Sequence, residues 1–382
     1  MAVVKFGGRD AELSTTGIDG RGRSIESWLV TREILQDLPA ALDTWGVKVW
    51  THDINRQQFA GGGGSGLSPD CLRHWTGAGQ NFYADCSHVE CCTAATRYPR
   101  TFAAQSISTL LAVEAARQRA QARAAPGVAY ALTTANADAL DPAISFGTHI
   151  SFQIARPLWE DLLLENRHPA ILGFVTSALA AAVPFFGAGY VLPLKNGSAV
   201  YSLSARAHHL CRLKTLSTTE AFRRGLLNSR REPHGRDHDR LHLICCDFGL
   251  LAAAPMFSFI QCLLAAAEEG YCGMNLYDPL RALHTWSWNL DLQTGRLPAT
   301  AMLVDGRHLT LPAYVRELAT TLLRMCEDGL IGEDVAPQAT EMLPRIVDLA
   351  SYAEEGSLQQ CGRQLDWASK LLCLIHACHQ DG

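Results

Sequence analysis

The strongest constraint on this chain is a charged, turn-rich segment that leads directly into a short apolar strand, N-S-R-R-E-P-H-G-R-D-H-D-R-L-H-L-I-C-C-D at residues 228–247. Its first fourteen residues, Asn228 to Leu241, carry four arginines, two aspartates, one glutamate and two histidines. Arginines clamp phosphate oxygens through paired hydrogen bonds, and carboxylates hold divalent cations. The segment is typical of a phosphate and metal site, but a surface ion-pair network has the same composition.

Composition narrows the class of protein. The 382 residues are 48% hydrophobic and 19% charged, which is ordinary for a globular protein with a large core. A net charge of −5 disfavours nucleic acid as a partner. The first ten residues lack the apolar stretch of a signal peptide, so we expect a cytoplasmic protein. Thirteen cysteines without a C-x-x-C pair indicate buried thiols rather than a structural zinc site.

One uncharged stretch, Ile171–Leu194, is long enough to span a bilayer. It contains Pro184, Pro193 and three glycines, and it lacks the basic flank that would orient a membrane helix. We therefore expect a buried core helix that ends near Gly187, and no membrane partner.

Two further clusters of carboxylates could carry chemistry. Asp10 and Glu12 are two residues apart, so on an extended chain both side chains point the same way and could hold Mg²⁺ between them. Asp85 and Glu90 lie in the segment N-F-Y-A-D-C-S-H-V-E, where a carboxylate such as Asp85 could act as a general base. A polar strand edge is the alternative for the first pair.

The segment at 228–247 resembles the signature of the Pup ligase and Pup deamidase (depupylase) family, whose members are similar in fold to glutamine synthetase. That signature reads Asn-Thr-Arg-Asp-Glu-Pro-His, then Arg-Leu-His before a strand that closes on Asp. Ser229 and Arg231 depart from it. The matching residues are Asn228, Arg230, Glu232, Pro233, His234, Arg240, Leu241, His242 and Asp247.

The other clusters follow in the family's order. Tyr83, Asp85, His88 and Glu90 match Tyr-x-Asp-x-x-His-Pro-Glu, with Val89 in place of proline. The family's opening Gly-x-Glu-x-Glu appears with aspartate at position 10. The motif S-F-G-T-H ends on His149, after which isoleucine and serine replace the family's Glu-Asn. Ser204 and Arg206 match the family's Leu-Ser-Gln-Arg-Ala, and Ala205 does not.

The resemblance implies site roles residue by residue. The expected catalytic residues are Asp85 and Arg230. Expected nucleotide contacts are Arg206, Arg230, His234, Arg240 and His242. The expected metal ligands are Asp10, Glu12, Glu90 and His149. For His149, a phosphate contact or a place in the core with its hydrogen bonds satisfied are the alternatives to metal binding. The cofactors implied are ATP and Mg²⁺.

The expected fold class is α+β: a curved, mainly antiparallel sheet with helices behind it, forming a single catalytic domain over 1–382. The glycine-rich stretch within 51–80 predicts a mobile loop, either a linker or an active-site lid, and 311–382 predicts a helical part. Helices are predicted at 24–44, 101–125, 171–187, 250–267, 278–289, 311–327 and 334–354. Strands are predicted at 3–6, 81–85, 128–133, 144–154 and 241–246.

Family members continue beyond the position of Leu365-Asp366-Trp367 into a further domain that helps engage Pup, whereas this sequence stops at Gly382. We therefore expect an ATP-dependent ligase that couples a small-molecule or peptide carboxylate to an amine, with Pup a doubtful substrate. An amidase of the depupylase type is the first alternative, favoured by the glycine-rich insertion and by the stretch R-R-G-L-L-N-S-R that ends on Arg230, which resembles the deamidase more than the ligase. A nucleotide-binding protein without turnover is the second, suggested by Asp10, Ile150 and Ser151.

Overall fold

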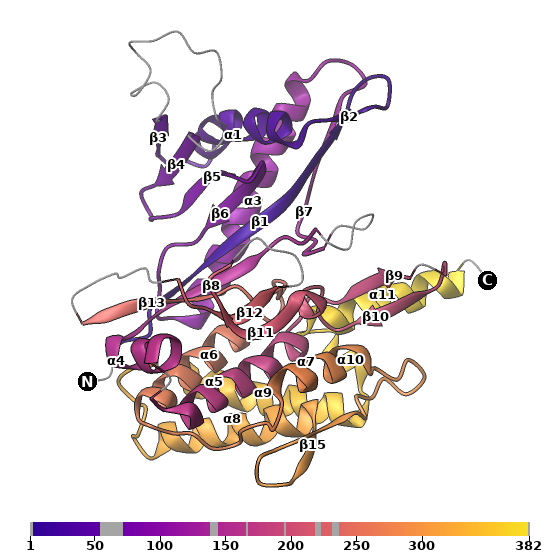
Figure 1. Ribbon diagram of the computed structural model, residues 1–382. Coiled ribbons are helices and arrows are strands. Elements are labelled where there is room, and N and C mark those ends of the chain that lie inside the picture. Colours follow the sequence, from indigo (N-terminus) through magenta and orange to yellow (C-terminus); the bar gives the residue numbers. More distant parts are fainter. Residues whose placement is uncertain are drawn as a thin grey trace. The chain divides into compact units, whose positions relative to one another are not determined.

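The computed structural model describes residues 3–53, 72–137, 144–165, 167–194, 196–217, 223–230 and 237–380. They form two compact units (Figure 1). The N-terminal unit comprises Gly8–Ala95 and Ala104–Ala135, and the C-terminal unit comprises Met1–Gly7, Thr96–Ala103 and Asn136–Gly382. The prediction of one catalytic domain over 1–382 stays a prediction, and each unit is described by itself.

The N-terminal unit is an antiparallel sheet with one helix-covered face. Its strands follow the order β1-β6-β5-β4-β3, and β2 and β7 pair with β1. The strands are β1 (Gly7–Ile18), β2 (Ser24–Ile25), β3 (Val49–Asp53), β4 (Leu72–Thr76), β5 (Asn81–Asp85), β6 (His88–Cys92) and β7 (Ala129–Thr133). The helices are α1 (Ser27–Asp43) and α3 (Pro99–Arg123).

Alternation of apolar and polar residues determines which face of this sheet is buried. Ala11, Leu13, Phe82, Ala84 and Val89 are almost fully buried and pack against α1 and α3 in one apolar core. Because successive side chains of a strand point to opposite faces, the residues between them leave the sheet on the other side. That second face carries the carboxylates of β1, β5 and β6.

The C-terminal unit combines four further strands of the 11-stranded sheet with a thick helical layer. These strands have the order β11-β12-β13-β8 and are antiparallel except where β11 pairs with β12. These strands are β8 (Thr148–Ala155), β11 (Leu210–Thr215), β12 (Arg224–Asn228) and β13 (His238–Leu243). Two separate hairpins are β9 (Tyr190–Pro193) with β10 (Ala199–Ser202), and β14 (Thr300–Met302) with β15 (His308–Thr310).

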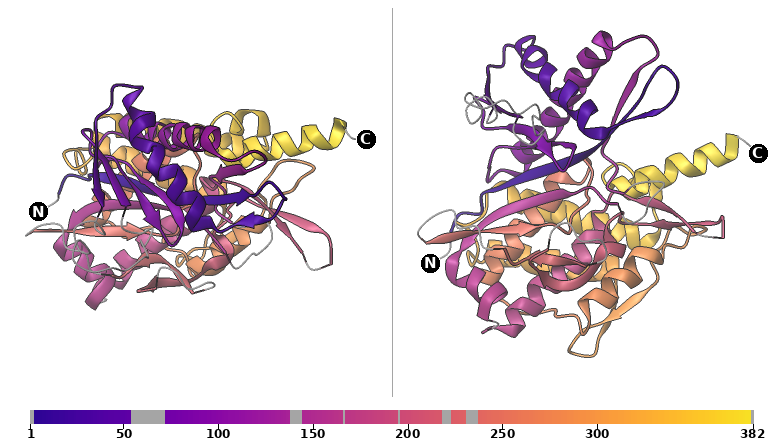
Figure 2. Two further views of the ribbon diagram at one scale, coloured as in Figure 1. Left: turned by 90° about the horizontal axis from the view of Figure 1, so that it is seen from above. Right: turned by 45° about the horizontal axis from the view of Figure 1, so that its top comes forward.

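Helices pack against one face of these four strands and against one another (Figure 1). They are α4 (Arg156–Glu160), α5 (Pro169–Phe185), α6 (Ala253–Glu268), α7 (Pro279–Trp288), α8 (Leu311–Glu327), α9 (Gln338–Glu355), α10 (Leu358–Cys361) and α11 (Asp366–Gln380), with short turns η2 (Asp161–Glu165) and η3 (Ala207–His209). The C-terminal helix α11, yellow in Figure 2, is tied to β10 by the hydroxyl of Tyr201, which donates to the carbonyl of Trp367 at 2.5 Å.

The predicted α+β class with a mainly antiparallel sheet is confirmed, and so are the helices of the C-terminal part. The apolar stretch from Ile171 forms most of α5, whose residues from Phe174 to Phe185 are buried. Among the described residues no single helix meets the length and apolarity needed to cross a membrane, although 156–164 and 169–185 pass together as a pair bent by 88°.

Several predicted boundaries are wrong. The first strand begins at Gly7 rather than Val3. The strand predicted at 241–246 is β13, which covers 238–243. Ile244 to Cys246 are buried, as their apolar character predicts, but they belong to no strand. Part of the predicted loop 51–80 is regular, since β3 pairs with β4. The glycine run at 61–64 lies outside the described residues, so its prediction as a mobile loop stays untested.

Candidate functional site

The polar face of the N-terminal sheet brings the predicted carboxylates together. Glu12 lies opposite Glu90, and Glu90 lies opposite Tyr83 on the next strand. Carboxylate oxygens of Glu12, Asp85 and Glu90 all lie within 4.8 Å of one another. Asp10 forms a second such group with Glu90 and the thiol of Cys92. Cross-strand register thus joins residues as far apart in the sequence as Asp10 and Cys92.

A strained hairpin turn holds Asp85 at the edge of this group. Asp85 pairs with His88 across a two-residue turn, and the turn residues Cys86 and Ser87 have φ values of 46° and 74°. Two-residue hairpin turns favour positive φ at both positions, but side chains other than Gly and Asn adopt it at a cost. The hydroxyl of Thr31 on α1 donates to the carbonyl of Ser87 at 2.8 Å, which anchors the turn.

The crowding of carboxylates on this face raises the pKa of Glu90. Glu90 is 5% exposed, and burial together with the charge of Asp10 raises its pKa to about 8. The Tyr83 hydroxyl donates to Glu90 Oε1 at 2.6 Å, and the guanidinium of Arg73 stacks 4.1 Å from the Tyr83 ring centroid. Negative groups held this close either take up protons or bind a cation. The donor set of oxygen atoms suits Mg²⁺.

The C-terminal unit carries a cluster of opposite sign on the polar face of β8, β12 and β13. Burial, and then repulsion from Arg206, Arg224 and Arg240, holds the pKa of His149 well below its usual value. The rings of His149 and His242 meet edge to face at 5.2 Å. We call Arg206, Arg224, Arg230, Arg240, His149 and His242 the cationic cluster.

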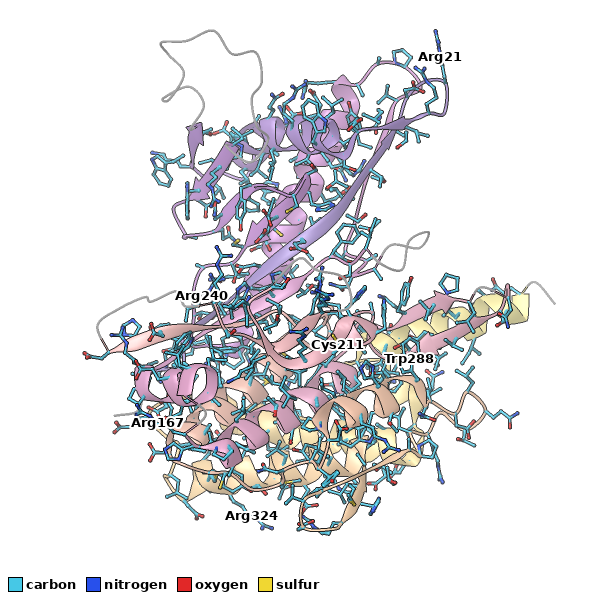
Figure 3. All side chains as sticks on the ribbon, viewed as in Figure 1. Arg21, Arg167, Cys211, Arg240, Trp288 and Arg324 are labelled. Atoms are coloured by element: carbon cyan, nitrogen blue, oxygen red, sulfur yellow. The ribbon has the colours of Figure 1, made fainter. Side chains whose placement is uncertain are left out.

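Short contacts fix the members of the cationic cluster. Ser151 lies opposite His242, and its hydroxyl accepts a hydrogen bond from Arg240 Nε at 2.8 Å. The Asn228 side chain accepts from the amide of Arg230 at 2.7 Å. Figure 3 labels Arg240 on β13. Burial, His149, Arg240 and Arg230 together lower the pKa of His242 to about 2, so this imidazole is neutral beside the arginines.

Two motif residues have clear structural reasons. A Cβ atom on Gly147 would lie 1.9 Å from His149 Nε2, so the glycine of S-F-G-T-H makes room for the histidine ring. The carboxylate of Asp247 accepts from the amide of Ala205 at 2.6 Å and attracts Arg206, yet burial raises its pKa to about 6. Asp247 therefore positions the turn that carries Arg206.

The predicted site residues thus fall into two groups. Asp10, Glu12, Asp85 and Glu90 lie together in the N-terminal unit. The cationic cluster contains the other predicted residues except His234, which lies outside the described residues. Proximity of Arg230 to the carboxylates stays a prediction, and so does metal binding by His149, whose described neighbours are cations.

Sequence reasoning assigned no role to Tyr83, Cys92, Asn81 or Arg224. Glu90 and Cys92 are two apart on β6, as are Asn81 and Tyr83 on β5, so period-two alternation was an available signal for these residues. Arg224 lies in the stretch R-R-G-L-L-N-S-R at 223–230, which resembles the deamidase, but no role was assigned to it; its position on β12 places it beside His149.

Comparison with known proteins places the chain in a family. The family model described as Pup-ligase protein matches residues 27–382. A Pup–protein ligase of Kocuria rhizophila is 29% identical over 253 residues, which are 62% of this chain and 50% of the relative. A Pup deamidase/depupylase of Mycolicibacterium smegmatis is 26% identical over 238 residues, 60% of this chain and 44% of the relative. The matched segment spans about half the length of these relatives.

Solved structures show the same fold. The complex of Pup with its ligase PafA aligns with a TM-score of 0.65 and 17% identity, covering 99% of this chain and 69% of that chain. A Pup ligase PafA in complex with ADP aligns with a TM-score of 0.56 and 20% identity, covering 86% of this chain and 69% of that chain.

These findings overturn the expectation that Pup is a doubtful partner. That expectation rested on where the sequence stops, whereas relatives of both kinds are named for Pup and a ligase solved with Pup bound aligns over almost the whole chain. The family match over residues 27–382 confirms the resemblance that the sequence motifs predicted. The chain belongs to the Pup-ligase family.

Proposed function

We propose that this chain is an ATP- and Mg²⁺-dependent ligase that joins a carboxylate of Pup to an amine. The observation that carries the proposal is the convergence of Glu12, Asp85 and Glu90 on one sheet face, with oxygens within 4.8 Å of one another. Support comes from relatives named Pup–protein ligase and from the fold shared with a ligase solved with ADP.

The carboxylate face would hold the metal and the base. Glu12 and Glu90 would bind Mg²⁺ with Asp10 beside them, and the ion would neutralise phosphate charge while the γ-phosphoryl group moves to the substrate carboxylate. Asp85 is less buried than Glu90 and lies at the strand end, where it would take the proton that the attacking amine must lose. Tyr83 would orient Glu90 through its 2.6 Å hydrogen bond.

The cationic cluster would bind phosphate. Arg230 is exposed and would contact phosphate oxygens directly, and Arg206 and Arg240 would supply further positive charge. His242 and His149, whose pKa values are lowered by burial and then by nearby positive charge, would each donate one ring N–H to a phosphate oxygen. His149 is assigned here to phosphate because its described neighbours would repel a metal ion.

An amidase of the depupylase type is the second candidate. A Pup deamidase/depupylase aligns over a stretch of similar length and identity to the ligases. In addition, Ser151 accepts from Arg240 at a position where the resemblance has asparagine, so this part of the site differs from the family's pattern. In this direction Asp85 would activate the attack on an amide instead of deprotonating an amine.

One incubation series separates the candidates. The chain is mixed with ATP, Mg²⁺ and Pup, with and without an amine-bearing protein, and ADP and product masses are measured. Conjugate formation with ADP that depends on both Pup and the amine supports the ligase. Loss of one amide from Pup carrying a side-chain amide, without amine-dependent ADP, supports the amidase. Neither product over the whole series would leave a nucleotide-binding protein without turnover and would refute both.

A further inference from the structure

A row of three polar side chains crosses β5, β6 and β1 beside the carboxylates. Asn81 lies opposite Cys92, and Cys92 lies opposite Asp10. Residues directly opposite one another in a sheet leave it on the same face, so the three side chains share a surface with Glu90. One oxygen each from Asp10 and Glu90 and the sulfur of Cys92 lie within 4.8 Å of one another.

Asn81 supplies an independent sign that a ligand belongs here. The residue is only 7% exposed, and its Oδ1 atom has no hydrogen-bond partner among the described residues. A buried acceptor without a partner is unfavourable, and a bound cation would offset that cost. Asn81 lies at the end of the row, directly opposite Cys92 on the neighbouring strand.

The donor types indicate which cation fits. Glu12, Asp85 and Glu90 offer oxygen alone, which suits Mg²⁺, whereas a thiolate selects softer ions such as Zn²⁺, Co²⁺ and Cd²⁺. Cys92 Sγ lies 3.9 Å from Glu90 Oε1, a separation that one ion with bonds of about 2.0–2.3 Å can span.

We propose that Asp10, Glu90, Cys92 and Asn81 form a second cation subsite, selective for thiophilic divalent ions of the Zn²⁺, Co²⁺ and Cd²⁺ class. The subsite deepens the metal site of the proposed function, because Glu90 belongs to both donor sets. Binding forms a metal–sulfur bond and breaks the S–H bond of Cys92, and the proton passes to solvent without any oxidation. Without the ion, the thiol donates to Tyr83 and Glu90 at 3.9 Å.

Cobalt provides a direct probe because a thiolate bound to Co²⁺ gives a charge-transfer band in the near ultraviolet. The metal-depleted full chain is titrated with Co²⁺, and the band and the protons released are followed. The wild type should give the band and release one proton per ion from Cys92 in addition to the proton displaced from Glu90, whose pKa is raised. Cys92→Ser should lose the band and bind Co²⁺ at least about tenfold more weakly, while its Mg²⁺ affinity changes less than about twofold.

Two further variants make the assignment specific. Cys86→Ser changes an exposed cysteine of the neighbouring turn and should keep the band at wild-type intensity. Asn81→Leu keeps the approximate size of the side chain but removes the unpartnered oxygen, so it should weaken Co²⁺ binding while the band survives. Equal Co²⁺ affinity in Asn81→Leu and wild type would remove Asn81 from the subsite.

The proposal is overturned if the wild type gives no band, or if Cys92→Ser keeps it. This outcome is distinct from failure of the proposed ligase, because ADP formation with Mg²⁺ is measured separately. A chain that gives the band yet makes no product would contradict the ligase and support the subsite. A chain that makes product with Mg²⁺ and gives no band would support the ligase and contradict the subsite.

Discussion

The sheet strands of the two units have polar faces that are built alike and carry opposite charge. In each unit the strands bury one face against helices and leave functional groups on the other. In the N-terminal unit, burial and neighbouring carboxylates raise the pKa of Glu90 to about 8. In the C-terminal unit, burial and neighbouring cations lower the pKa of His242 to about 2.

The contrast teaches which ligand each face requires. Both shifts have burial as the largest cause and like charge as the next, so both faces reduce their own charge when nothing is bound. A divalent cation would relieve the first face, and a phosphate group would relieve the second.

The largest expected effect is on turnover and comes from Asp85. Asp85→Asn keeps the size of the side chain but removes the base, so product formation should fall by about 10²–10⁴-fold while ATP binding is largely kept. Rates of conjugate formation under saturating ATP measure this. Asp43→Asn, on the exposed end of α1, is the matched control. Turnover in Asp85→Asn equal to that of the control would remove Asp85 from the mechanism.

Metal binding should depend next on Glu12. Glu12→Gln removes one charged ligand and should weaken Mg²⁺ by about 10–100-fold. Titration calorimetry of the variant and of Asp43→Asn measures the difference. Unchanged affinity would separate Glu12 from the metal site.

The same face predicts a pH dependence. Folding raises the pKa of Glu90 from 4.5 to about 8, so in the metal-free chain its contribution to stability is complete below about pH 4.5 and disappears as the pH rises through about 8. Mg²⁺ binds the deprotonated form, so the stabilisation that it confers should grow between about pH 6 and about pH 9. Denaturant midpoints with and without Mg²⁺ test this, and a stabilisation that shrinks over this range would contradict the cause given for the shift.

The cationic face should respond to phosphate. Arg240→Gln removes a charged donor worth about 1.5–3 kcal/mol, which corresponds to about 10–100-fold weaker ATP binding. Arg324→Gln is the control, since this exposed residue lies at the end of α8, on the far side of the helical layer from Arg240 (Figure 3). Equal losses in both variants would mean that general charge, rather than this cluster, attracts the nucleotide.

A buried histidine outside both faces gives the smallest effect and serves as a reference. His74 is 2% exposed, its ring nitrogen meets the Thr51 hydroxyl at 2.9 Å, and burial lowers its pKa to about 4. Because the folded pKa is lowered, its contribution to stability is present above about pH 6.5 and is lost as the pH falls towards about 4. His74→Gln should flatten this slope in acid denaturation, whereas the exposed His376→Gln should not.

Much of the site was predictable because its residues lie in short sequence motifs, or in strands whose alternating polar and apolar side chains show which face is polar. The spacing of Asp10 and Glu12 predicts side chains on one face, and the apolar run from Ile171 predicts the buried α5. The grouping of Asn81, Cys92 and Asp10 depends on register among three strands, which no single strand encodes. The partner was predicted wrongly because the argument used the end of the sequence instead of the residues that bind.

The most direct test of the account measures whether the carboxylate face holds a divalent cation. Mn²⁺, a paramagnetic substitute for Mg²⁺, is titrated into the metal-free chain, and the signal of free Mn²⁺ is followed by electron paramagnetic resonance. The account predicts that the wild type depletes this signal. A variant that combines Glu12→Gln, Asp85→Asn and Glu90→Gln, and that circular dichroism shows to be folded, should leave the signal undiminished. Equal depletion by both proteins would contradict it.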